Sequence, residues 1–163
     1  MFRVGFGQDS HRFVSDKDNK KLILGGVEIA NCAGLEGNSD ADVIAHAIFN
    51  SLSQAIGDRS IGVYADKLCL EENILDSFRY LEIMRDKLKE KNLEINNLGI
   101  SVEAKIPRLE PYHDKIKKRF CDFFHLDQDR IGLVFTSGEG LTAFGQGKGI
   151  QVSVVVSLFA IQS

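Results

Sequence analysis

Long hydrophobic stretches are missing from this sequence of 163 residues. No run of apolar residues approaches the roughly 20 that a helix needs to cross a lipid bilayer. The first residues also lack the charged segment, followed by an apolar one, that marks a secretory signal peptide. We therefore expect neither a membrane-spanning segment nor a secretory leader.

Cysteine is scarce, and Cys32, Cys69 and Cys121 lie far apart along the chain. An odd number of widely spaced cysteines argues against a disulfide framework. None of them has a second cysteine three residues away, so we expect small, buried, apolar side chains rather than catalytic thiols. A reducing, cytoplasmic location is the simplest interpretation.

Excess charge of either sign is also missing, since the formal net charge is only -3. Such a balance gives no electrostatic attraction for nucleic acid or for an anionic membrane surface, and we expect neither as a partner. The composition, with 44% hydrophobic and 26% charged residues, fits one globular domain over residues 1–163.

Apolar periodicity predicts strands that alternate with helices. Strands are expected at residues 3–8, at 20–30 with a turn or bulge at Gly25 and Gly26, and at 93–106, 131–137 and 150–160. Helices are expected at residues 39–56, 73–91 and 111–124, with 59–72 as a loop. Ser39 is the expected N-cap of the first helix, with Asp42 completing a capping box. This order predicts an α/β fold of the α+β type, in which helices cover one side of a mixed sheet.

Three polar residues suggest chemistry. Asp9 and His11 lie two apart where the first predicted strand runs into a loop, so both side chains would share one face. His46 lies at the margin of the apolar stripe of the first predicted helix. One carboxylate and two imidazoles can form a zinc site whose fourth position stays open to a substrate oxygen. From spacing alone, an ordinary loop residue at His11 and a buried structural histidine at His46 remain open alternatives.

Glycine is concentrated in residues 136–149, TSGEGLTAFGQGKG. Such a segment lets backbone amides approach a phosphate closely, but it matches neither a Walker A motif nor a dinucleotide fingerprint. A turn within a wide hairpin is the simpler alternative.

Short motifs follow one another over nearly the whole chain. They are Gly7-Gln8-Asp9-Ser10-His11, Ser39-Asp40-Ala41-Asp42 with His46 behind it, Ala104-Lys105-Ile106-Pro107-Arg108, and Thr136-Ser137-Gly138-Glu139. In this order and at these separations the sequence resembles the 2-C-methyl-D-erythritol 2,4-cyclodiphosphate synthase family of the non-mevalonate isoprenoid pathway. Each motif alone is weak evidence, because it can occur by chance. The probability that all of them occur by chance is the product of their separate probabilities, so the set is specific.

The resemblance implies an intramolecular phosphoryl transfer. In the family, the 2-phosphate of 4-diphosphocytidyl-2-C-methyl-D-erythritol 2-phosphate attacks the β-phosphorus of the cytidine diphosphate arm, and CMP leaves. Reactants of such high charge need neutralisation and in-line positioning, which two divalent cations can supply. The resemblance implies zinc on Asp9, His11 and His46, and magnesium or manganese on Glu139.

The resemblance also implies the remaining site residues. Catalytic roles fall to Ser137 and to Asn38, which stands where the family usually has a histidine. The implied substrate-binding residues are Asp9, Ser10, His11, Asn38, Ser39, Asp58, Gly62, Asp66, Ala104, Lys105, Ile106, Pro107, Arg108, Leu109, Thr136, Ser137, Gly138 and Glu139. Within this set, residues 104–109 correspond to the cytosine pocket, and Asp58, Gly62 and Asp66 to the methylerythritol contacts.

The family is a homotrimer with active sites between subunits. Zinc ligands and nucleotide contacts are therefore expected on different chains, with the glycine-rich turn and the last strand facing the threefold axis. Two other functions stay open at this stage. A zinc-dependent phosphohydrolase would use the same open metal position, and a non-catalytic trimeric module would bind a small ligand along the axis.

Overall fold

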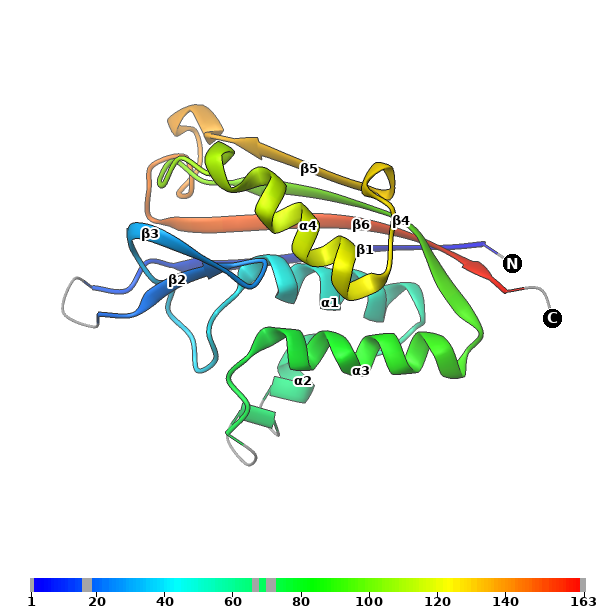
Figure 1. Cartoon of the computed structure of the whole chain (residues 1–163). Coiled ribbons are helices and arrows are strands. Elements are labelled where there is room, and N and C mark those ends of the chain that lie inside the picture. Colours follow the sequence, from blue (N-terminus) through cyan, green and yellow to red (C-terminus); the bar gives the residue numbers. More distant parts are fainter. Residues whose placement is uncertain (1, 16–18, 66–67, 70–72, 162–163) are drawn as a thin grey trace.

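A four-stranded mixed sheet forms the centre of the molecule in the computed structural model, which describes residues 2–15, 19–65, 68–69 and 73–161 (Figure 1). Its strands, in order across the sheet, are β1 (Phe2–Arg12), β6 (Gly149–Ala160), β4 (Leu93–Glu103) and β5 (Ile131–Thr136). Strand β6 runs antiparallel to β1 and β4, whereas β4 and β5 are parallel. A separate hairpin pairs β2 (Lys21–Leu24) with β3 (Val27–Ala33).

Helices cover one face of this sheet (Figure 1). They are α1 (Val43–Ala55), α3 (Ser77–Glu90) and α4 (His113–Phe124), with the short α2 (Ile61–Ala65) between α1 and α3. Alternate residues of β6 are fully buried beneath the helices, namely Ile150, Val152, Val154, Val156 and Leu158. The predicted α+β class, with a mixed sheet covered by helices on one side, is confirmed.

Helix α1 lies directly on β1, because the strand carries glycine where the helix crosses it. A Cβ atom at Gly5 would lie only 2.0 Å from the carbonyl oxygen of Ser51, and Gly7 is constrained in the same way by the next turn of the helix. Any side chain at these positions would push the helix outward. The close approach places His46, on α1, beside the end of β1.

The beginning of α1 corrects a prediction. The helix starts at Val43 rather than near Ser39, because Asp42 and not Ser39 is its N-cap. The Asp42 carboxylate accepts hydrogen bonds from the N–H groups of Ile44 and Ala45, and also from Gly25 and Gly26 in the β2–β3 turn. One buried carboxylate thus fixes both the helix end and the hairpin, which no local capping pattern predicts.

Other boundaries also differ from the sequence pattern. Strand β1 continues to Arg12, so Asp9 and His11 lie within the strand and not in an exit loop. Helix α3 begins at Ser77 with Asp76 as its N-cap, four residues later than predicted, and β4 ends at Glu103 instead of residue 106. Residues 61–65, predicted as loop, form α2.

The opposite face of the sheet carries none of the described helices and exposes several large apolar side chains. Its exposed side chains are Phe2, Val4, Phe6, Val134 and Val155, each between 48% and 64% exposed. A shallow hollow of about 340 Å³ lies among Gly99, Ser101, Gly132, Val134, Ser153 and Val155. Exposed apolar surfaces are common at protein–protein interfaces.

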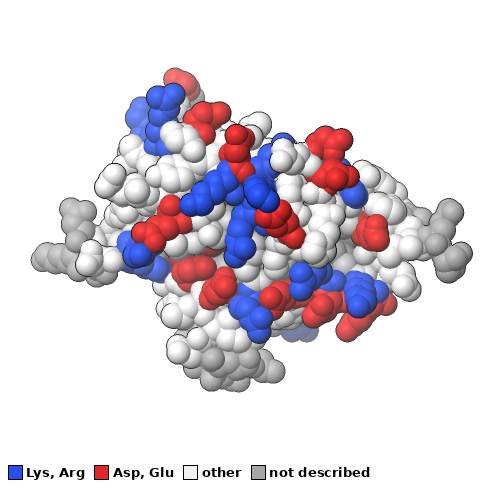
Figure 2. All heavy atoms as spheres, in the orientation of Figure 1, with Lys and Arg blue, Asp and Glu red and all other residues white. Residues whose placement is uncertain are grey.

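Charges on the helix-covered side are mixed. On the face drawn in Figure 2, basic and acidic side chains lie side by side over the helices, without a large area of one sign.

None of the described helices combines the length and apolarity that a membrane span requires. The three cysteines are free thiols, and Cys69 and Cys121 are buried as predicted, while Cys32 is half-buried.

Candidate metal centre

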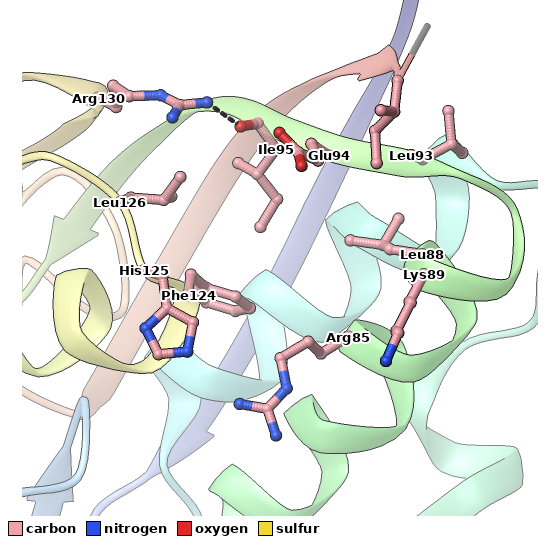
Figure 3. A pocket seen from close by; sticks show the side chains of 11 residues that line it. Arg85, Leu88, Lys89, Leu93, Glu94, Ile95, Phe124, His125, Leu126 and Arg130 are labelled. Carbon is pink, nitrogen blue, oxygen red and sulfur yellow. Dashed lines mark hydrogen bonds between the residues drawn. The ribbon is translucent and has the colours of Figure 1, made fainter. Parts of the chain in front are cut away.

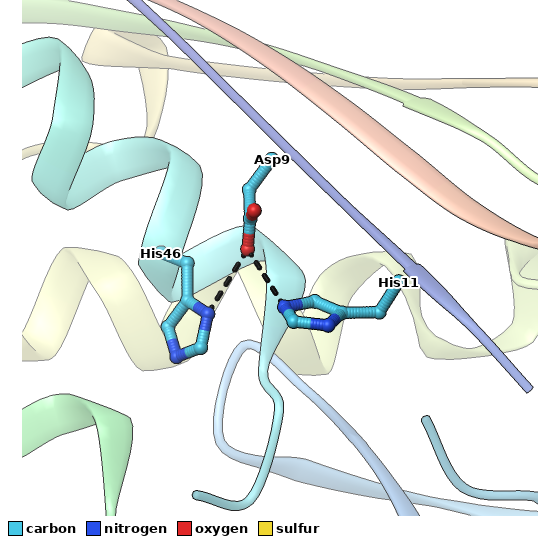
Figure 4. A group of neighbouring side chains, drawn as sticks. All are labelled: Asp9, His11 and His46. Carbon is cyan, nitrogen blue, oxygen red and sulfur yellow. Dashed lines mark hydrogen bonds and ion pairs between the residues drawn. The ribbon is translucent and has the colours of Figure 1, made fainter. Parts of the chain in front are cut away.

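Asp9, His11 and His46 converge between β1 and α1 (Figure 4). Oδ2 of Asp9 lies 3.0 Å from Nε2 of His11 and 3.0 Å from Nδ1 of His46. The three potential ligand atoms all lie within 4.8 Å of one another. The described part of the chain contains no other group of three histidine, cysteine or acidic side chains whose ligand atoms lie this close together. The three side chains together could hold a metal ion.

Asp9 is held in the form that binds cations. Burial alone raises the pKa of its carboxyl group, but hydrogen bonds and charge interactions with His11 and His46 outweigh burial and lower the pKa to about 2. The carboxylate is therefore ionised at neutral pH, as a metal ligand must be.

A pocket of about 280 Å³ opens beside the three ligands. It is lined by Asp9, His11, His46, Gly37, Asn38, Ser39, Ile61, Ala65, Cys69 and Tyr80. The structure thus brings two other predicted residues, Asn38 and Ser39, to the same pocket. The Ser39 hydroxyl oxygen accepts a hydrogen bond from the backbone N–H of Ala41 at 3.1 Å, which stabilises the turn before α1.

Lys20 holds this turn, and the sequence analysis missed it. Its ammonium group donates to the carbonyl oxygens of Gly37 at 2.9 Å and Ser39 at 2.8 Å, while the Cys69 thiol donates to that of Asn38 at 3.2 Å. Burial lowers the pKa of Lys20, and the nearby Asp40 carboxylate acts in the opposite direction. The contacts span 17 and 19 residues, so no local sequence signal reveals them.

Two of the predicted methylerythritol contacts, Asp58 and Gly62, lie beside or within α2. Asp58 accepts a hydrogen bond from the Tyr64 hydroxyl at 2.9 Å and forms an ion pair with Lys87 at 2.5 Å. The hydrogen bond from Lys87 lowers the pKa of Asp58 to about 2, with burial acting in the opposite direction. Gly62 lies in α2 between two residues that line the metal pocket, and Asp66 lies outside the described residues.

Of the remaining predicted residues, Ser10 lies on β1 and lines neither the metal pocket nor the second cluster, whereas the others gather in this second cluster, at the ends of β4 and β5. A recess of about 220 Å³ is lined by Ala104, Lys105, Pro107, Arg108, Leu109, Glu110, Phe135, Thr136 and Ser137. The Ser137 hydroxyl lies 3.4 Å from the Glu139 carboxylate, and Ile106, which does not line the recess, is 51% exposed. Glu139 has a φ of 51°, a left-handed conformation within a glycine-rich turn.

The two clusters lie at opposite edges of the sheet. Ser10 is paired with Gln151, Gln151 with Glu103, and Glu103 with Thr136. Three strand spacings therefore separate β1 from β5, a distance of roughly 14 Å. Within one chain, the metal ligands and the Thr136–Glu139 segment do not form one compact site.

A further recess lies at the other end of the sheet, between α3, α4 and the start of β4 (Figure 3). Its volume is about 360 Å³, and none of the predicted site residues lines it. Its arginines are paired within the chain. Arg130 donates to the carbonyl oxygens of Ile95 and Asn96, and the Arg85 guanidinium lies 4.9 Å from the centre of the Phe123 ring. We assign no chemistry to this recess.

Known proteins resemble the chain over its whole length. The YgbB family profile matches residues 2–159. A curated 2-C-methyl-D-erythritol 2,4-cyclodiphosphate synthase from Chlamydia trachomatis serovar A is 42% identical over 158 residues, which are 97% of this chain and 88% of the relative.

Solved structures share the fold. IspF of Plasmodium falciparum in complex with CDP is 28% identical with a TM-score of 0.85, covering 99% of this chain and 97% of that one. The bifunctional IspDF from Campylobacter jejuni is 29% identical with a TM-score of 0.90, and its match covers 99% of this chain and 43% of that one. The chain therefore belongs to the YgbB family, and its function is that of a 2-C-methyl-D-erythritol 2,4-cyclodiphosphate synthase, a lyase of isoprenoid biosynthesis.

Proposed function

We propose that the chain carries out this cyclisation with two divalent cations, at a site shared between subunits of a homotrimer. The substrate is 4-diphosphocytidyl-2-C-methyl-D-erythritol 2-phosphate. An oxygen of its 2-phosphate forms a bond to the β-phosphorus, and the bond from that phosphorus to the oxygen bridging it to the α-phosphorus breaks. CMP leaves with the bridging oxygen. The convergence of Asp9, His11 and His46 beside an open pocket carries the proposal.

Zinc fits the first metal position, because one carboxylate and two imidazoles are a donor set typical of catalytic zinc. A bound zinc would neutralise charge and polarise a phosphate oxygen at its open position. Asn38 and Ser39 border the same pocket and have side chains able to donate hydrogen bonds to a phosphate. The Lys20 ammonium group, fixed behind them, adds a positive charge where Asn38 replaces the family histidine.

The nucleotide end fits the second cluster. Ala104 to Leu109 would surround the cytosine, while Thr136, Ser137 and Gly138 would contact the diphosphate. Glu139 would hold magnesium or manganese, which prefer carboxylate oxygen. The exposed recess at these residues supports this assignment, and a relative of the same fold was solved with CDP.

A trimer would join the two clusters. Each chain has its candidate metal ligands at one edge of the sheet, on β1 and the overlying α1, and its nucleotide residues at the other edge, beside β5. A heterologous contact repeated around a threefold axis pairs one edge with the opposite edge of the next chain and closes after three copies. The exposed apolar face of the sheet supplies a surface for such an interface.

We place this single-domain enzyme in the cytoplasm.

Turnover of the substrate tests the metal requirement. We expect CMP and a cyclic diphosphate in equal amounts, loss of both after treatment with a chelator, and recovery when zinc and magnesium are returned together. Full activity in protein shown to contain no metal would contradict the proposal. A linear phosphorylated product would instead indicate the zinc phosphohydrolase, and ligand binding without turnover the non-catalytic module.

A further inference from the structure

His46 has a hydrogen-bonding partner on each nitrogen of its ring. Nδ1 lies 3.0 Å from the Asp9 carboxylate, and Nε2 lies 2.8 Å from the hydroxyl oxygen of Ser77. Ser77 is the first residue of α3 and is 1% exposed, and His46 is 8% exposed. Because water has little access to either group, their mutual contact decides which hydrogen-bonding role each plays.

Asp40 fixes the direction of the Ser77 hydroxyl group. One carboxylate oxygen of Asp40 accepts a hydrogen bond from this hydroxyl, and the other accepts from the backbone N–H of Ser77 at 3.0 Å. Both oxygens of Asp40 act as acceptors in these contacts, so the hydroxyl hydrogen of Ser77 points to Asp40. The lone pairs of the Ser77 oxygen then face His46 and accept a hydrogen from Nε2.

Asp40 is itself held in place from both sides. Its carboxylate accepts a further hydrogen bond from the backbone N–H of Asp42 at 3.1 Å, and its own N–H donates to the carbonyl oxygen of Leu75 at 2.9 Å. Ser39 is a weaker partner for His46. Its hydroxyl oxygen lies 3.4 Å from Nε2 and already accepts from Ala41. The path from Asp40 through Ser77 to His46 is therefore the dominant one.

We propose that Asp40 and Ser77 are positioning residues for the metal, which act only through His46. With a hydrogen on Nε2, neutral His46 must present the lone pair of Nδ1 toward Asp9. Nδ1 of His46 and the Asp9 oxygen are both electron-rich and lie 3.0 Å apart, so they repel each other unless a proton or a metal ion lies between them. The hydrogen-bonded relay from Asp40 through Ser77 to His46 thus orients Nδ1 as a ligand. It favours binding of a positive ion between Nδ1 and the Asp9 carboxylate. This inference rests on the proposed metal site and adds to it the groups that prepare the site.

Zinc affinity tests the relay. Loss of a group that orients a metal-binding histidine typically weakens metal affinity by about 10–100-fold. We expect that loss for Ser77→Ala, measured by competition with a chromophoric chelator. The matched control is Ser51→Ala, which removes another fully buried serine hydroxyl, one that donates to the carbonyl oxygen of Ile48 on the same helix as His46. The control should change zinc affinity less than about twofold, although both variants lose a buried hydrogen bond of roughly 1 kcal/mol.

Nuclear magnetic resonance of histidine-labelled protein gives an independent readout. We expect Nε2 of His46 to carry a hydrogen in the metal-free and the zinc-loaded protein, and Nδ1 to bind the zinc. A wild-type spectrum with Nε2 unprotonated would overturn the relay, as would equal zinc affinity in Ser77→Ala and Ser51→Ala. If Ser77→Ala does not fold, the wild-type spectrum and the zinc affinity of Ser77→Thr decide the question. Ser77→Thr keeps the hydroxyl group and should therefore keep the wild-type zinc affinity. If the wild-type protein binds no zinc at all, the metal proposal fails by itself, whereas the metal-free spectrum still judges the relay.

Discussion

The carbonyl oxygen of Ala47 lies 2.2 Å from the point that a Cβ atom on Gly7 would occupy. Helix α1 and strand β1 are therefore in backbone contact two residues from Asp9 and one residue from His46. The distance between these two candidate metal ligands depends on the absence of a side chain at residue 7. The absence of a side chain at Gly7 thus contributes both to the stability of the fold and to the geometry of the site.

Gly7→Val should accordingly lower the free energy of unfolding by about 3 kcal/mol or more, because the new side chain forces helix and strand apart. Chemical denaturation measures this loss. The control is Gly62→Ala, where a Cβ meets no atom within 4 Å and φ is not positive. Equal stability of the two variants would show that the helix does not need the close contact.

His46→Ala should remove the bound metal and reduce cyclisation at least about 1000-fold, because the remaining two ligands cannot complete a three-residue zinc site. Elemental analysis and a CMP-release assay measure both effects. The control is His125→Asn, at the end of α4 and with a φ of 54°, a conformation that asparagine tolerates. Metal retained at the wild-type level by His46→Ala would exclude this histidine as a ligand.

Lys20→Met should lower kcat/KM by about 10–100-fold, since the turn carrying Asn38 and Ser39 loses both of its charge-assisted hydrogen bonds and shifts relative to the phosphate. The adjacent Lys21→Met is a close control. The Lys21 side chain is 70% exposed and pairs with Glu28 on the surface, where an ion pair contributes little. A similar loss in both variants would indicate a general charge effect instead of a role for the turn.

The pairing of Asp58 with Lys87 should appear in the pH dependence of stability. The pKa of Asp58 falls from its ordinary 3.8 to about 2 on folding, so the stabilisation is complete above about pH 4 and disappears as the pH falls through 2. Lys87→Met should therefore be less stable than the wild type by roughly 1 kcal/mol at pH 7, and this difference should shrink between pH 4 and 2. Lys118→Met, which removes an exposed pair with Asp122, is the control and should show a smaller difference. A difference that stays constant down to pH 2 would contradict the assignment.

Val155→Asp should convert the proposed trimer to monomers, because a charge among the exposed apolar residues of the sheet face cannot be buried in an interface without a partner. Light scattering after size-exclusion chromatography measures the mass. Leu75→Asp places the same charge on another exposed apolar residue, 47% exposed, and should leave the mass unchanged. A wild-type protein that is monomeric at micromolar concentration would contradict the trimer itself.

The sequence predicts most of the fold, because strand and helix periods in this chain are regular. The alternating apolar residues of β6 show directly which side of the strand faces the core. Boundaries fail where a distant group decides them. Asp42 caps α1 while also binding Gly25 and Gly26, and Asp40 reaches the start of α3 through Ser77. Such contacts leave no periodic trace.

The candidate site was likewise predictable from the sequence only in part. Asp9 and His11 share a strand face by simple alternation, so their proximity is predictable from the sequence. That His46 joins them depends on the glycines of β1, and the motif resemblance supplies it where periodicity cannot. Lys20 and Ser77 carry no motif, since each acts through contacts more than 15 residues away.

Complementation between two inactive variants tests the shared site most directly. His46→Ala lacks a metal ligand and Glu139→Gln lacks the second cation's ligand, so each alone should be inactive. In mixed trimers formed at equal amounts, about a quarter of the sites combine the intact metal ligands of one chain with the intact Glu139 of its neighbour. We expect recovery of roughly that fraction of wild-type CMP release. No recovery in trimers verified to contain both variants would contradict it, because every site would then lie within one chain.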